Sequence, residues 1–182
     1  VNTLGYVGKY QLGVDTLQTL GYVRPRIDGK RYSNSELSNS NIWTGKGNVN
    51  SLDEFLSNKN NVQETSMYEN ISFNYGILKD KGVIDSTNSD PSQVAGYLAA
   101  AHLAGAGGAA NYAISGANAA DGYGTRTSAY YALGVDAIGA NSRIGSQVAS
   151  AASPGSGLNT VLNYVRSYAG ALNVPAMGNP PA

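Results

Sequence analysis

Cysteine is absent from this chain of 182 residues, and histidine occurs only once. Without cysteine there are no structural disulfides, no cysteine-ligated zinc and no thiol catalysis. A single histidine argues against a Ser-His-Asp triad and against a histidine-rich metal site. We therefore expect neither a metal nor another cofactor.

Charge and long apolar runs are also scarce. Charged residues make up 13% of the chain, and 12 basic side chains balance 12 acidic ones. Nucleic-acid binding needs a concentrated basic surface, so no nucleic-acid partner is expected. No run approaches the roughly 18 apolar residues that span a bilayer, so no membrane span is expected. No signal peptide is present, and the first residue is Val1 rather than Met, which predicts a processed, excised or partly sequenced chain.

Helical patterns dominate what is present. Apolar side chains recur at helical spacing, and capping residues precede several of these runs. Asp90-Pro91 is a strong start, with a capping Asp followed by Pro at the first helical position. The expected helices cover 8–20, a short segment after Ser51, 61–80, 94–104 with a continuation through Ile114, and a segment capped by Thr125 or Thr127.

The predicted fold class is mainly α. A polar loop over 23–50 has Trp43 as its only large anchor, and a short β-hairpin within Arg24–Asn50 is left open. We expect one domain over 1–139, then a Ser/Ala/Gly/Pro linker over 140–157. An amphipathic helix over 158–174 and a flexible tail over 175–182 complete the predicted organisation.

Four segments in order resemble the motifs of lytic transglycosylases, the lysozyme-like enzymes that cut peptidoglycan. Gly8-Lys9-Tyr10-Gln11 resembles the family's Gly-x-x-Gln motif, and Asn70-Ile71 with Tyr75, Gly76 and Leu78 resembles its next helix. Residues 100–109, AAHLAGAGGA, resemble the family's Ala-rich helix end, and 125–130 its late Thr/Tyr segment. The nearest likeness is to a phage and bacterial subgroup with GKYQ and AAHL-x-G-x-GG motifs.

The resemblance implies a helical fold of the lytic transglycosylase or goose-type lysozyme kind. It implies cleavage of the β-1,4 bond between N-acetylmuramic acid and N-acetylglucosamine in peptidoglycan glycan strands. The expected setting is a virion tail, baseplate or injection apparatus with other virion proteins as partners, or an extracellular or periplasmic cell wall. In the family the catalytic glutamate precedes the Gly-x-x-Gln motif, so it is expected upstream of Val1.

The candidate substrate-binding residues are Gly8, Tyr10, Gln11, His102 and Tyr130. An amide such as that of Gln11 can donate to and accept from an acetamido group, and a tyrosine ring offers a flat face to a sugar. Tyr10 equally fits a core aromatic, and His102 fits a satisfied core histidine. His102 and Leu103 stand where other family members have Tyr and Asn.

No residue of this chain is assigned a catalytic role. A general acid that cuts a glycosidic bond needs a carboxyl whose pKa is raised. The glutamates of the chain are expected to be structural: Glu36, Glu54, Glu64 and Glu69. Two other functions are left open: a non-catalytic structural or glycan-binding virion domain on a lysozyme-like scaffold, and a secreted bacterial wall-binding module.

Overall fold

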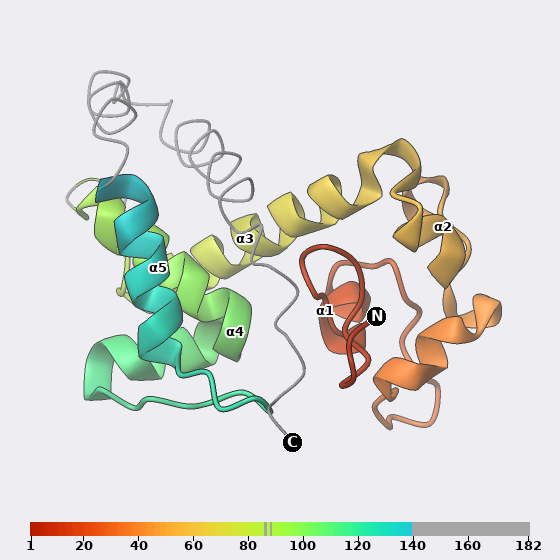
Figure 1. Ribbon diagram of the computed structural model, residues 1–182, viewed down its shortest axis with the longest axis horizontal. Coiled ribbons are helices and arrows are strands. Elements are labelled where there is room, and N and C mark those ends of the chain that lie inside the picture. Colours follow the sequence, from red (N-terminus) through yellow and green to blue (C-terminus); the bar gives the residue numbers. More distant parts are fainter. Residues whose placement is uncertain (86, 88, 140–182) are drawn as a thin grey trace. The chain divides into compact units, whose positions relative to one another are not determined.

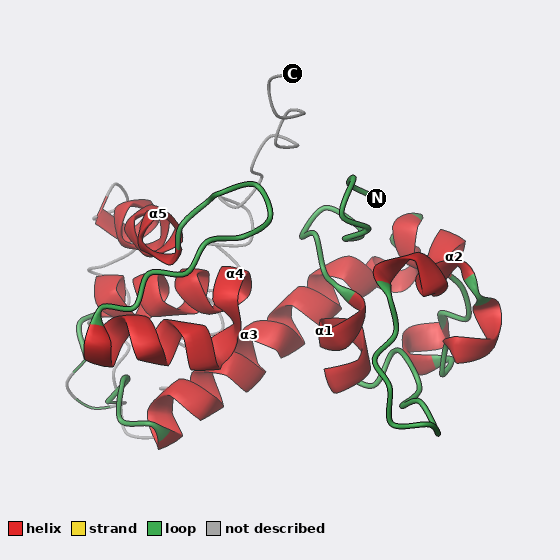
Figure 2. Cartoon of the chain, turned by 90° about the horizontal axis from the view of Figure 1, so that it is seen from below, coloured by secondary structure: helices red, strands yellow, loops and turns green. Residues whose placement is uncertain are grey.

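A computed structural model describes residues 1–85, 87 and 89–139 (Figure 1). The linker, helix and tail expected over 140–182 lie outside these residues. The described part is helical, and Figure 2 shows no strand in it. Its β-type pairing consists of isolated bridges such as Val23–Trp43. This bridge borders the polar loop, and no hairpin forms within Arg24–Asn50. The mainly α prediction is therefore confirmed.

The chain divides into two compact units at a boundary within α3, which spans Val62–Asp80. The first unit, Val1–Asn70, contains the short helices α1 (Val14–Thr19) and α2 (Leu52–Leu56). Single 3-10 turns lie between and after them: η1 (Asn34–Ser38), η2 (Ser40–Ile42), η3 (Lys46–Asn48) and η4 (Lys59–Asn61).

Aromatic side chains form the centre of the first unit. The ring centroid of Phe55 lies 6.4 Å from that of Tyr22 and 5.8 Å from that of Trp43. All three residues are buried, and the indole N–H of Trp43 donates to the carbonyl of Leu37 at 2.9 Å. Trp43 thus anchors the polar loop as the sequence predicts, because a buried indole needs an acceptor.

The second unit begins at Ile71 and contains α4 (Pro91–Ser115) and α5 (Thr127–Gly139). Asp90 caps α4, as predicted, and Pro91 occupies its first turn. Gly105 has a φ of 69° and a ψ of 164° inside α4, so the helix is interrupted where the sequence predicts an end. The side chain of Asn118 accepts from the Ser128 N–H at the start of α5.

Helices α4 and α5 lie side by side (Figure 1). They pack closely because glycines face each other at their contact. A Cβ atom on Gly134 would lie 2.4 Å from the carbonyl oxygen of Ala95 and 2.8 Å from Cα of Gly96. Real Cβ atoms do not approach backbone this closely. Only glycine at position 134 therefore allows this helix separation.

Candidate functional site

The Gly8–Gln11 motif is a tight turn and not the start of a helix. Val7 and Leu12 exchange two backbone hydrogen bonds of 3.0 and 2.9 Å, which close the turn. Gly8 has a φ of 71° and Gln11 a φ of 51°. These left-handed conformations are incompatible with a right-handed helix. The helix expected over 8–20 is corrected to α1, which begins at Val14.

Gln63, near the start of α3, fixes this turn. Its side chain is buried, and its Oε1 accepts the backbone N–H of Lys9 at 2.7 Å. Its Nε2 donates to the carbonyls of Phe55 at 3.0 Å and Leu56 at 3.2 Å. A Cβ atom on Gly8 would lie 2.5 Å from Gln63 Oε1, so glycine leaves space for the contact.

The side chains of the turn differ in exposure. Tyr10 is buried, with 6% of its surface exposed, and the ammonium of Lys9 lies 4.9 Å from its ring centroid. Gln11 is exposed, and its Nε2 donates to the Gly8 carbonyl at 2.7 Å. This bond restrains the amide while the side chain stays at the surface. Gln11 is thus the member of the turn best placed to meet a ligand.

A cleft of about 390 Å³ adjoins the turn within the first unit. Val7, which closes the turn, is one of its lining residues. The other lining side chains are small, polar or apolar, and none carries a charge: Val1, Asn2, Thr3, Leu4, Gly5, Ser33, Asn34, Ser35, Ser38 and Leu52. Such a lining suits a neutral ligand that has both apolar and polar faces.

The two remaining predicted residues, His102 and Tyr130, lie together in the second unit. Their ring centroids are 6.4 Å apart, with 39° between the ring planes. His102 belongs to α4 and Tyr130 to α5. Burial, followed by the nearby carboxylate of Asp121, raises the pKa of the Tyr130 hydroxyl. The structure therefore groups Gly8, Tyr10 and Gln11 in the first unit, and His102 with Tyr130 in the second.

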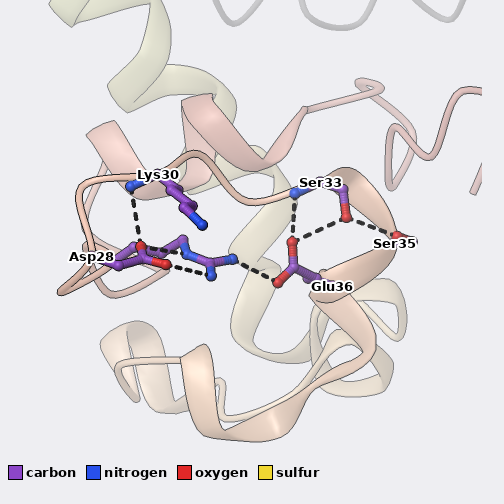
Figure 3. Close-up of polar contacts among 6 residues, drawn as sticks. Asp28, Lys30, Ser33, Ser35 and Glu36 are labelled. Atoms are coloured by element: carbon purple, nitrogen blue, oxygen red, sulfur yellow. Dashed lines mark hydrogen bonds and ion pairs between the residues drawn. The ribbon is translucent and has the colours of Figure 1, made fainter.

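Glu36 is held in a polar network at the start of η1 (Figure 3). Its carboxylate accepts the Ser33 backbone N–H at 2.7 Å and pairs with the Arg26 guanidinium at 2.9 Å. Arg26 also makes two 2.8 Å bonds to the carboxylate of Asp28. The Ser33 backbone bond is the main cause that lowers the pKa of Glu36, and Arg26 adds to it.

The other three glutamates of the chain also carry ion pairs. Glu54 pairs with Lys59 at 2.6 Å, Glu69 with Lys46 at 2.8 Å, and Glu64 with Lys9. The Lys59 hydrogen bond lowers the pKa of Glu54. Partial burial raises the pKa of Glu64, but bonds from Lys9 and Asn58 outweigh it and the net shift is downward. These shifts are opposite to the one a general acid needs.

Sequence patterns did not single out Gln63, although the Gln63 side chain holds the turn in place. The helix expected from residue 61 begins at Val62, and the Asn58 side chain accepts the Gln63 N–H at 2.9 Å. Asn61 has a φ of 56°, which places it outside the helix. A glutamine in the first turn of a helix is common, so no local signal marks Gln63 as a buried bridge.

The described residues contain neither a cluster suited to a metal ion nor a helix able to cross a membrane. No three His, Asp or Glu side chains gather in a way that suits a metal ion. None of the described helices has the length and apolar character to cross a membrane. Comparisons with protein families, with curated proteins and with solved structures gave no match to the chain.

Proposed function

We propose that this chain acts on peptidoglycan as the glycan-binding part of a lysozyme-like domain. The observation that carries the proposal is the turn at Gly8–Gln11. Gln63 fixes its backbone, Gln11 presents an amide at the surface, and Val7 borders a cleft whose lining side chains carry no charge. An amide can bind the acetamido group of an amino sugar through both its donor and its acceptor.

In this proposal the ring of Tyr10 packs into the core and supports the turn, and Gln11 contacts the sugar. Cleavage of the β-1,4 bond also needs a protonated carboxyl. The ion pairs of Glu36, Glu54, Glu64 and Glu69 make the glutamates of this chain poor candidates. The acid of a lytic transglycosylase would then come from outside these 182 residues, as the resemblance implies.

A second function, glycan binding without cleavage, is favoured by the same ion pairs. The four glutamates are neutralised by four different cations, which is what a structural role requires. The setting that we propose for either function is a phage tail or injection apparatus or a cell wall, and it rests on the sequence resemblance.

Sedimentation with purified peptidoglycan sacculi tests the shared part of both functions. We expect the chain to co-sediment, and Gln11→Ala to weaken binding about fivefold to thirtyfold, since it removes one or two hydrogen bonds of about 1 kcal/mol each. Gln93→Ala is the matched control, because Gln93 is an exposed glutamine of α4. Equal binding by the Gln11 and Gln93 variants would contradict the proposed site.

Release of soluble muropeptides distinguishes cleavage from binding. We expect the 182-residue chain to release none. A longer chain carrying a glutamate upstream of Val1 should release them if the domain is a transglycosylase. Release by the 182-residue chain, abolished by Glu64→Gln but not by Glu54→Gln, would assign catalysis to a residue that we place in a structural ion pair.

A further inference from the structure

Three tyrosines of the second unit form a cluster that neither the motifs nor the proposed turn includes. The ring centroid of Tyr131 lies 4.9 Å from that of Tyr97 and 5.6 Å from that of Tyr112. The ring planes are tilted by 55° in both pairs. Each of the three residues is half-buried, so part of each ring meets solvent. We call these residues the tyrosine triad.

The helix backbones hold the triad in place. A Cβ atom on Gly96 would lie 2.6 Å from Cε2 of Tyr131, so the ring occupies the space that a side chain at position 96 would need. Tyr97 and Tyr112 lie on either side of the interruption of α4 at Gly105. The close contact at Gly134 keeps α5, and with it Tyr131, against α4. Fixed aromatic rings lose little conformational entropy when a ligand binds.

Very few charges surround the triad in sequence. Over 91–139, the charged side chains are Asp121, Arg126 and Asp136 alone, and the carboxylate of Asp90 lies just before α4. Burial raises the pKa of the Tyr131 hydroxyl, and the neighbouring Tyr97 and Tyr112 raise it further, as does the Asp90 carboxylate, which is close enough to act on it. The Tyr131 hydroxyl therefore stays neutral and able to donate at physiological pH. The tyrosine triad offers apolar ring faces and hydroxyl groups together.

A neutral sugar has the complementary chemistry. The C–H faces of a pyranose ring are apolar, whereas its edge carries hydroxyl and acetamido groups. Tyrosine combines an apolar body with a polar tip, so it can contact both. We propose that the tyrosine triad is a second glycan-contact surface, which binds a neutral oligosaccharide of N-acetylated hexoses. The identity of the sugar rests on the proposed function, whereas the surface itself rests on the triad.

Titration with chitotetraose, a soluble and uncharged tetramer of N-acetylglucosamine, tests this surface directly. We expect the NMR ring signals of all three triad residues to shift together on a single binding curve. Tyr97→Ala and Tyr112→Ala should each weaken binding about tenfold. Tyr68→Ala is the control, since Tyr68 is a half-buried tyrosine of α3 in the first unit. A highly sulfated tetrasaccharide should bind more weakly, because the Asp90 carboxylate, which acts on the Tyr131 hydroxyl, repels sulfate groups.

Some outcomes overturn the triad surface alone, and others separate it from the proposed function. Triad signals that stay unchanged at millimolar chitotetraose overturn the surface, and so does an equal loss of affinity in Tyr68→Ala. Sacculi binding that depends on Gln11 but not on Tyr97 or Tyr112, together with unshifted triad signals, overturns the surface and leaves the proposed function standing. Shifted triad signals with no binding to sacculi leave the surface standing and overturn the peptidoglycan function.

Discussion

In the first unit, polar side chains hold loops together, whereas in the second unit small residues let two helices touch. Asn34 illustrates the first kind of contact: its side chain accepts the Val14 N–H at 2.8 Å and donates to the Leu4 carbonyl at 2.9 Å. Lys46 likewise donates to the Leu20 carbonyl at 2.6 Å and pairs with Glu69. In the second unit, Gly134 contributes by having no side chain at all.

This difference shows how each unit can offer a rigid surface. In irregular segments many backbone N–H and C=O groups lack a helical partner, and each buried group needs another hydrogen-bond partner. Gln63, Asn34 and Lys46 supply such partners in the first unit. Regular helices satisfy their own backbone, so α4 and α5 need only close packing. Substitutions that remove a polar side chain should therefore destabilise the first unit. Substitutions that add a side chain at the helix contact should destabilise the second.

Gly134→Ala is expected to have the largest effect on stability. The new Cβ would meet backbone atoms of Ala95 and Gly96, which cannot rotate away, so α5 must move from α4. We expect a loss of roughly 2–3 kcal/mol in the free energy of unfolding, even though alanine favours a helix by about 1 kcal/mol over glycine. Amide hydrogen exchange in α4 and α5 measures the change.

Gly107→Ala is the matched control for this substitution. Gly107 lies in α4, has no positive φ, and a Cβ there would meet nothing within 4 Å. We therefore expect it to stabilise the helix by up to about 1 kcal/mol. If both variants changed stability in the same direction and by similar amounts, the close contact at Gly134 would not hold the two helices together.

Gln63→Ala should have the next largest effect, and it acts by removing a side chain. It leaves the Lys9 N–H and the carbonyls of Phe55 and Leu56 without this partner. Because buried polar groups without a partner destabilise a fold, we expect a loss of about 2 kcal/mol in the free energy of unfolding. Exchange of the Lys9 amide should accelerate, whereas Gln93→Ala should leave it unchanged. Unaltered Lys9 exchange in Gln63→Ala would mean that the turn is fixed by its own bonds.

The sequence predicts the parts of this fold that depend on neighbouring residues. Asp90 and Pro91 mark the start of α4, and the Ser51 hydroxyl accepts the Glu54 N–H at 3.2 Å as the capping pattern predicts. Local patterns could not predict the turn at Gly8–Gln11, because the contact that fixes it comes from Gln63, 54 residues from Lys9.

Local sequence patterns could not predict the tyrosine triad either. Its members come from two helices, and their meeting depends on the glycines at positions 96 and 134. Nothing in the sequence near Tyr97 indicates that Tyr131 will lie over Gly96. The resemblance singled out Tyr130, the residue just before Tyr131, and the structure places Tyr130 beside His102. Adjacent residues on a helix point about 100° apart, so a shift of one position selects a different surface.

Acid should give the smallest effect, and it should distinguish the two units. The pKa values of Glu36, Glu54 and Glu64 lie below the ordinary 4.5 in the folded chain. Because these pKa values are depressed, their contribution to stability is complete above about pH 4.5 and is lost as the pH falls through the folded values. The ion pairs are partly exposed to solvent, so each contributes little, and salt should weaken them further.

We therefore expect side-chain NMR signals of the first unit to broaden or shift on acidification to about pH 3. The contact between α4 and α5 carries no charge at Gly96 and Gly134, so its amides should stay protected from hydrogen exchange. Glu54→Gln should reduce this acid response, because glutamine cannot form the ion pair with Lys59 at any pH. Gln93→Ala should not change it. If acid removed protection in α4 and α5 first, electrostatic contacts would matter more in the second unit than its glycine packing indicates.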